Sequence, residues 1–300
     1  MKTIKLIKTF LLFASTILFL SACSSQKVKA PNEEAPKLLA KIKSTPINQI
    51  DLQKNMPTIS QHSISDALAK EQYHANIWDE MRLHFDLANL NYGEYDEYIT
   101  FYNKRKHHME KISERAEPYL YYIFNEVKRR GMPYEIALLP AVESGFRAQA
   151  RSNMRALGLW QFIPSTGDIF DLHRNWWYDG RKDVTRSTQA ALDYLEKLYK
   201  LNNNDWLLAL ASYNSGLGNV YKAQKRYRKH HKNLPNIEKS QPNFWQIQAF
   251  LPKETQGYVP KLLALSHIYE YHELFQVNIQ AVANDPFFEE FQINKQIALD

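Results

Sequence analysis

The spacing of apolar residues constrains the fold of this chain more than any other feature. From about Ser65 onward, apolar side chains recur every three or four positions, which is the period of an amphipathic helix. The clearest stretches are residues 65–85, 98–131, 187–201, 205–216 and 254–275. No alternation of the kind found in strands persists beyond a few residues, and only residues 275–282 could form a short strand. The sequence therefore predicts an all-α fold.

Residues that favour helix ends support these boundaries. Basic residues at 128–130 followed by Gly131 predict a helix C-terminus, because a cation complements the helix dipole and glycine adopts positive φ. Asp205 is a good N-cap for the stretch that closes on Gly216. For the preceding stretch, either Thr185 or Ser187 could be the N-cap.

The first 22 residues have the pattern of an export signal. Three lysines precede an apolar run that is short for a membrane-spanning helix, and small residues follow it. The segment Leu20-Ser21-Ala22-Cys23 resembles the bacterial lipobox, in which the cysteine is lipidated and becomes the new N-terminus. We therefore expect residues 1–22 to be a lipoprotein signal peptide and Cys23, the only cysteine, to anchor the protein in a membrane. The alternative is an uncleaved anchor with an incidental cysteine.

The residues after Cys23 predict where the protein lies. Residues 23–60 hold four prolines and scattered charges, which predicts a flexible tether. The residue after the cysteine is Ser24, not aspartate, which by resemblance to lipoprotein sorting in Gram-negative bacteria favours the outer membrane, facing the periplasm. The formal charge of +6 includes three lysines of the signal, so the mature chain is too mildly basic to indicate a nucleic-acid partner.

Glu143 is the candidate catalytic acid. It is the only acidic residue between Pro140 and Gly167, and its sequence neighbours are mostly apolar. A carboxyl group held against apolar side chains loses hydration, so its pKa rises and it can stay protonated near neutral pH. The alternative is an exposed charge at a helix end. Pro140 either kinks this helical run or splits it.

Two further stretches carry groups that suit a sugar. In "GLWQFIPSTG", Gly158 permits close backbone approach, Gln161 offers a donor and an acceptor, and Trp160 and Phe162 offer flat apolar faces. In "SYNSG", Tyr213 and Asn214 add polar tips. Taken singly, each stretch could equally be core packing or a cap.

Together these motifs resemble the lysozyme-like lytic transglycosylases of family 1, which have an Slt-type catalytic domain. Four motifs follow the family's order and spacing. They are Glu143-Ser144-x-Phe146, the motif that begins at Gly158, Ala211-x-Tyr213-Asn214, and "LPKETQGYVPKLLA" with Glu254 and Tyr258. The resemblance covers roughly residues 95–270 and implies a lysozyme-like helical domain at 121–275, after a helical extension at 61–120 and before a tail at 276–300. Relatives in the family's D group usually carry glycan-binding LysM modules after this domain, for which the tail leaves no room, so we expect the lipid anchor to localise the protein.

The resemblance implies that one glutamate acts as acid and then as base on peptidoglycan. Glu143 would protonate the oxygen that links N-acetylmuramic acid to N-acetylglucosamine, and would then deprotonate the muramic C6 hydroxyl as that oxygen attacks C1. The product would be a 1,6-anhydromuramoyl end. Substrate-positioning residues would be Ser144, Gln161, Tyr213, Asn214, Tyr258 and Glu254. Two alternatives are a lysozyme-like hydrolase that uses water and a catalytically weak glycan-binding lipoprotein.

The remaining features are weaker. The ten histidines show no metal-ligand spacing, so we expect no metal and no cofactor. The basic run at 222–232 is either an exposed helix face without a specific role or a surface that attracts anionic glycan or membrane. The pair Trp176-Trp177 could stack on sugar or pack against helices, and Asp179, Arg181 and Asp183 should pair to order their loop. The sequence gives no oligomeric state.

Overall fold

The computed structural model describes residues 75–289. The predictions for the signal peptide at 1–22, for Cys23 and for the tether at 23–60 lie outside the described residues. Within 75–289 all regular structure is helical, which confirms the all-α prediction. The β-type pairing in these residues consists of four isolated bridges. No helix in this part of the chain is long and apolar enough to cross a bilayer.

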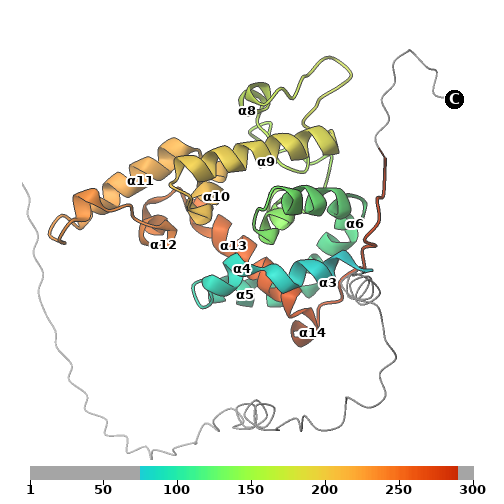
Figure 1. Ribbon diagram of the computed structural model, residues 1–300, viewed down its shortest axis with the longest axis horizontal. Helices are drawn as coiled ribbons and strands as arrows, with labels where there is room; N and C mark the ends of the chain where they lie inside the picture. The colour runs from blue at the N-terminus through green and yellow to red at the C-terminus, as the bar shows by residue number, and fades with distance from the viewer. Residues whose placement is uncertain (1–74, 290–300) are drawn as a thin grey trace, which may run out of the picture. The chain divides into compact units, whose positions relative to one another are not determined.

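Figure 1 shows how the helices follow one another along the chain. The α-helices are α3 (Ile77–Met81), α4 (Asp86–Leu90), α5 (Asp96–Asn103), α6 (Lys106–Arg129), α7 (Leu139–Glu143), α8 (Pro164–Ile169), α9 (Val184–Leu201), α10 (Trp206–Ser215), α11 (Leu217–His230), α12 (Phe244–Ile247), α13 (Lys253–Glu270) and α14 (His272–Phe275). Four short 3-10 helices join them: η1 (Arg82–His84), η2 (Tyr134–Leu138), η3 (Ile237–Lys239) and η4 (Gln248–Phe250).

Helix α13 is the element around which the described helices pack. It contacts α4, α5, α7 and α10, and in Figure 1 it runs from beside α10 towards α4 and α5. Leu262, Leu263 and Leu265 in its centre are fully buried, so the helix is covered on nearly all sides. A helix with most of its residues buried is fixed by the core around it, and this one carries the base of the functional site.

The expectation of one helix over residues 98–131 is wrong. The chain breaks between α5 and α6, where Arg105 leaves helical geometry with φ −132° and ψ 41°. The Arg105 guanidinium donates to the Phe101 carbonyl at 2.9 Å and lies 3.8 Å from the centre of the Phe101 ring. These contacts close the end of α5. No proline or glycine stands at the break, so the sequence pattern gave no sign of it.

Two further expectations need correction. Residues 275–282 form no strand; Val277 and Val282 are buried in the core, and the Val282 carbonyl accepts from Ile77 N at 2.9 Å without a neighbouring strand. The N-cap of α9 is Asp183, which accepts from Arg186 N, and not Thr185 or Ser187. Asp205 as the N-cap of α10 is confirmed.

The glycine-marked helix ends are confirmed. Gly131 follows the last turn of α6 with φ +63°, and Gly216 ends α10 with φ +85°. Both values lie in the left-handed region, which glycine adopts without a steric penalty.

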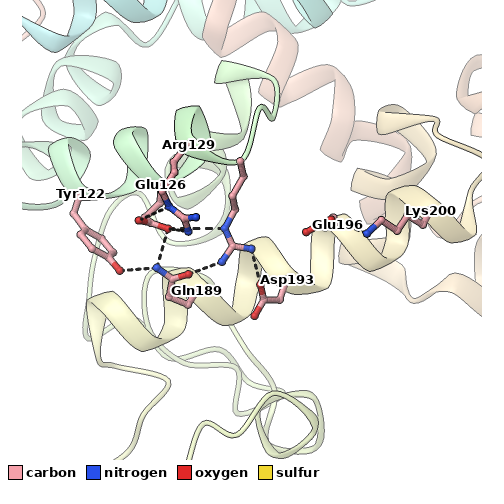
Figure 2. A network of polar contacts seen from close by, with 8 residues as sticks. Tyr122, Glu126, Arg129, Gln189, Asp193, Glu196 and Lys200 are labelled. Carbon is pink, nitrogen blue, oxygen red and sulfur yellow. Dashed lines mark hydrogen bonds and ion pairs between the residues drawn. The ribbon is translucent and has the colours of Figure 1, made fainter.

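A polar network fixes α9 against α6 (Figure 2). The Gln189 amide donates to the Tyr122 hydroxyl at 3.0 Å and to Glu126 Oε2 at 2.8 Å, and Glu126 also pairs with Arg129 at 2.7 Å. An ion pair from Arg130 to Asp193 adds a second link between the two helices. This matters for the site because α9 also carries Tyr194, which lines the cleft described below.

Arg181 orders its own loop, between α8 and α9, and ties it to the loop between α7 and α8. It is 6% exposed, and its guanidinium grips Asp179 with two bonds of 2.9 and 2.6 Å. The same group donates to the carbonyls of Arg155 and Phe162 at 2.8 and 3.1 Å. Asp183 caps α9 and accepts from the Tyr178 hydroxyl at 3.1 Å. The predicted pairing of the loop charges is therefore confirmed for Arg181 with Asp179.

Gly158 makes this arrangement possible. Its φ is +84°, and a Cβ placed on it would lie 2.0 Å from the Arg181 carbonyl oxygen. The close approach expected at Gly158 therefore exists, and the partner is the protein's own backbone.

We expect Gly158→Ala to lower the free energy of unfolding by more than about 3 kcal/mol, because it adds both backbone strain and a clash. Urea denaturation measures the change. The matched control is Gly218→Ala in α11, where nothing lies within 4 Å of the added Cβ; there we expect no loss, and a gain of up to about 1 kcal/mol. Equal effects at both positions would contradict this account of the loop.

Candidate functional site

A cleft of about 530 Å³ lies where the four motifs meet. The end of α7, the loop before α8, the end of α10 and the start of α13 all contribute to its walls. The lining residues are Glu143, Ser152, Met154, Ala156, Gln161, Phe162, Ile163, Thr166, Tyr194, Tyr213, Asn214, Ser215, Gly216 and Glu254. The structure therefore brings together Glu143, Gln161, Tyr213, Asn214 and Glu254 from four separate segments.

Glu143 is the last residue of α7. The 3-10 helix η2 ends at Leu138, and Pro140 then occupies the first turn of α7, where its missing N–H costs nothing. Pro140 therefore splits the run rather than kinking one helix. Because α7 packs against α13, the Glu143 carboxyl faces Tyr258, whose hydroxyl donates to Glu143 Oε1.

Three influences act on the pKa of Glu143. Burial, the largest of them, raises the pKa, the hydrogen bond from Tyr258 lowers it, and the nearby Glu254 carboxylate raises it; the net result is a pKa of about 7. The direction is the one expected from the apolar sequence neighbours. The two specific modifiers come from α13, more than a hundred positions away in the sequence. A carboxyl with such a pKa can both donate and accept a proton near neutral pH.

A raised pKa alone does not mark the site. Burial also raises the pKa of Glu135 to about 7, but this carboxylate accepts from Ala88 N at 3.0 Å and lies in the core, away from the cleft. Glu135 therefore holds η2 against α4. What distinguishes Glu143 is the cavity onto which it opens.

Ser144 and Tyr258 lie behind the cleft rather than in its lining. The Ser144 hydroxyl is buried between the carbonyls of Pro140 and Leu159, at 3.1 and 3.0 Å, so it ties the end of α7 to the second-motif loop. Tyr258 is 4% exposed and reaches the site only through Glu143. Positioning Glu143 suits both residues better than touching a ligand.

Gln161, Tyr213 and Asn214 line the cleft and are themselves held in place. Gln161 has φ +49°, and its amide nitrogen donates to the carbonyls of Gly158 and Ala150 at 2.8 and 3.2 Å. The Tyr213 hydroxyl donates to the Trp160 carbonyl at 2.9 Å, and burial raises the tyrosine pKa well above its ordinary value. Neutral, fixed hydrogen-bonding groups of this kind suit a hydroxyl-rich ligand.

The second carboxylate of the cleft is Glu254. It is exposed, and Asn214 Nδ2 lies 3.5 Å from its Oε1, while Asn214 Oδ1 accepts from the Thr255 hydroxyl at 2.7 Å. Thr255 was missed at the sequence level, although it stands beside Glu254 in the fourth motif. The Thr255 hydroxyl orients Asn214, because its bond to Oδ1 leaves the Nδ2 group of the amide directed at Glu254.

The apolar wall of the cleft agrees with the expectation at Phe162 but not at Trp160. Trp160 is fully buried and donates to Thr188, so it belongs to the core and offers no face to a sugar. Phe162 lines the cleft as expected, and Tyr194 and Tyr213 complete the wall. The ring centre of Tyr213 lies 6.3 Å from that of Phe162 and 5.4 Å from that of Tyr194. Tyr194 was also missed, because α9 carries no motif and only its packing against α10 brings it to the cleft.

The remaining candidates lie outside the cleft. Trp176 and Trp177 stack on each other and are 92% and 78% exposed, so they do not pack against helices. The basic run occupies the end of α11 and the residues after it. In the described part of the chain, no three His, Cys, Asp or Glu side chains are grouped to hold a metal ion.

The fold and the site define a helical domain with one buried acid in an aromatic-walled cleft. Residues 121–236 match the family model of the transglycosylase SLT domain, so this part of the chain is similar to that domain. The matched segment contains Glu143, Gln161, Tyr213 and Asn214. Glu254 and Tyr258 lie beyond it.

Individual proteins are also similar to parts of this chain. The chain is 43% identical over 178 residues to membrane-bound lytic murein transglycosylase D of Escherichia coli K12. The aligned residues make up 59% of this chain and 37% of that protein. It is 50% identical over 111 residues to a putative tributyltin chloride resistance protein of Alteromonas sp. strain M-1, covering 37% of this chain and 54% of the relative. The chain thus spans well under two thirds of the length of either relative.

Two solved structures are also similar. An inactive variant of the lytic transglycosylase Slt of Pseudomonas aeruginosa matches with a TM-score of 0.39 and 23% identity, over 51% of this chain and 24% of that one. The 70 kDa soluble lytic transglycosylase of Escherichia coli matches with a TM-score of 0.37 and 21% identity, over 50% of this chain and 24% of that one.

We expect two substitutions to move the pKa of Glu143 in opposite directions. Tyr258→Phe removes a hydrogen bond to the ionised carboxyl and should raise the pKa, whereas Glu254→Gln removes a neighbouring negative charge and should lower it. Titration of ¹³C-carboxyl-labelled glutamate by NMR measures both shifts. Glu135 is the internal control, because it contacts neither residue and its pKa should stay unchanged. Shifts of the same sign in the two variants would contradict this account.

Proposed function

We propose that this protein is a lytic transglycosylase that cleaves the β-1,4 bond between N-acetylmuramic acid and N-acetylglucosamine in peptidoglycan. The observation that carries the proposal is Glu143, a carboxyl with a pKa raised to about 7, opening onto a cleft within the SLT-domain segment. The name of the Escherichia coli relative, a murein transglycosylase, supports the choice of substrate.

The proposed reaction needs one proton-transfer group. Protonated Glu143 gives its proton to the glycosidic oxygen as the bond from that oxygen to C1 of muramic acid breaks. The resulting carboxylate then takes the proton of the muramic C6 hydroxyl while O6 bonds to C1, which returns Glu143 to its protonated form. The products are a free hydroxyl on N-acetylglucosamine and a 1,6-anhydromuramoyl end, and no water is consumed. The substrate's own acetamido group would stabilise the positive charge that develops at C1.

The other residues of the site have supporting roles in this proposal. Tyr258 and Ser144 orient Glu143, through the hydrogen bond to its carboxyl and through the end of α7. Gln161, Tyr213 and Asn214 position the sugars from the walls of the cleft. Glu254 adds to the rise in the pKa of Glu143, which burial mainly causes.

Glu254 also favours a second candidate function. A hydrolase that inverts or retains configuration uses two carboxylates, one as acid and one as base or nucleophile. Glu254 is a second carboxylate in the same cleft, and in a lysozyme-like hydrolase it would activate a water molecule. The products distinguish the two reactions.

We further propose that Cys23 anchors the protein in the outer membrane, with the domain facing the periplasm. The support is the lipobox-like segment before Cys23 and the serine after it. The name of the Escherichia coli relative describes that protein as membrane-bound, which agrees with an anchor.

Mass spectrometry of the muropeptides released from purified sacculi tests the proposal. The transglycosylase predicts ends that are one water lighter than a reducing end. Products that carry the full water would establish the hydrolase instead. The absence of released products from a correctly folded protein would contradict both reactions and leave glycan binding as the function.

A further inference from the structure

A second cavity, of about 740 Å³, lies beside the cleft and is rich in arginine. Arg115, Arg147 and Arg151 line it, and no acidic residue does. The other lining residues are Pro118, Tyr119, Phe146, Ala148, Gln149 and Ala150. We call this cavity the arginine pocket.

None of the three arginines forms an ion pair within residues 75–289. Arg115 and Arg147 are anchored by carbonyl groups: Arg115 donates to Gly145 at 3.3 Å, and Arg147 Nε donates to Ser144 at 2.8 Å. Each of these contacts uses one of five N–H groups, so most donors of both guanidiniums stay available. Arg151 is exposed and makes no side-chain hydrogen bond with the described chain.

The pocket therefore carries uncompensated positive charge on partly fixed groups. The pKa of His108 reports the same field: burial lowers it, and Arg115, Arg105 and Arg147 lower it further. Guanidinium groups bind carboxylates through paired, charge-assisted hydrogen bonds, and pre-positioned ones lose less entropy in doing so. The ligand that suits this pocket is an anion with carboxylate groups.

The arginine pocket and the catalytic cleft share a wall. Glu143 lines the cleft, while Phe146, three residues later, lines the pocket. In the next segment Ala150 and Arg151 line the pocket, and Ser152 lines the cleft. The Ala150 carbonyl accepts from the Gln161 amide of the cleft at 3.2 Å. A chain lying in the cleft can therefore send a short side branch over this wall.

We propose that the arginine pocket binds the carboxylates of the acidic peptide that branches from a murein strand while the strand occupies the cleft. This inference rests on the proposed function, because it takes the substrate to be peptidoglycan. An extended peptide of about four residues spans roughly 13 Å, which suits a ligand that crosses one wall of backbone. The pocket would then favour strands that carry peptides over bare glycan.

Binding of two strand preparations tests this proposal, one with intact peptides and one stripped of them by an amidase. A Glu143→Gln background prevents cleavage during the measurement. We expect the intact strands to bind at least about tenfold more tightly, since hydrogen bonds between charged groups are stronger than those between neutral groups. Arg151→Gln, and more strongly Arg147→Gln with Arg151→Gln, should remove this preference and leave binding of stripped strands unchanged.

Arg155→Gln is the matched control. Arg155 is exposed in the turn closed by the bridge between Arg151 and Leu157, and it lies outside the pocket lining. Removing this charge should leave the preference intact. An equal loss in Arg155→Gln would indicate a general charge effect and overturn the proposal.

Two further results would also overturn it. One is equal binding of intact and stripped strands by the unsubstituted pocket. The other is a pocket variant that loses binding only to vesicles containing phosphatidylglycerol, which would assign the arginines to a membrane surface. Cleavage of the stripped strands by the wild-type enzyme is measured separately. If the wild-type enzyme does not cleave the stripped strands, the proposed function is contradicted. The preference for intact over stripped strands in the binding measurement still decides whether the pocket binds the peptide.

Discussion

The contact between Tyr258 and Glu143 is the interaction on which the site depends. It joins α13, the most buried helix, to the last residue of α7, a helix of only five residues. A short helix cannot hold a side chain rigidly by itself, because isolated helices of this length are unstable. The acid therefore takes its position from the core: α7 packs on α13, and Tyr258 reaches from α13 to the carboxyl.

The second constraint is the clamp that Arg181 places on the loop between α7 and α8. A buried guanidinium is costly unless every donor is used, and here Asp179 and two carbonyls occupy it. Glycine at 158 lets the Arg181 backbone approach this loop. The loop in turn presents Gln161 to the cleft and accepts the Ser144 hydroxyl at Leu159. The first and second motifs are thus one structural unit, which explains why their residues occur together.

Much of this could be read from the sequence, and the failures have physical causes. Local signals sufficed for the helical class and for the caps at Asp205 and Gly216, whereas they left the burial of Glu143 open against an exposed charge at a helix end. They failed at Arg105, where contacts of its guanidinium with Phe101 close α5 without a proline or glycine to mark the break. They also failed at Trp160, which lies in the core with its ring nitrogen donating to Thr188, far away in the sequence. Tyr194 belongs to the site because α9 packs against α10, and Thr255 because its hydroxyl meets Asn214, and neither contact is visible in the sequence. The second carboxylate, Glu254, was visible as a motif residue, but its effect on Glu143 required their proximity in space.

The central claim is that Glu143 alone carries the proton through the reaction, and the most direct test is Glu143→Gln assayed on purified sacculi. Glutamine has nearly the same shape but cannot exchange a proton. The account predicts that release of muropeptides falls by at least about 10²-fold, while the variant keeps its fold and still binds sacculi. Undiminished release by a folded Glu143→Gln variant would contradict it.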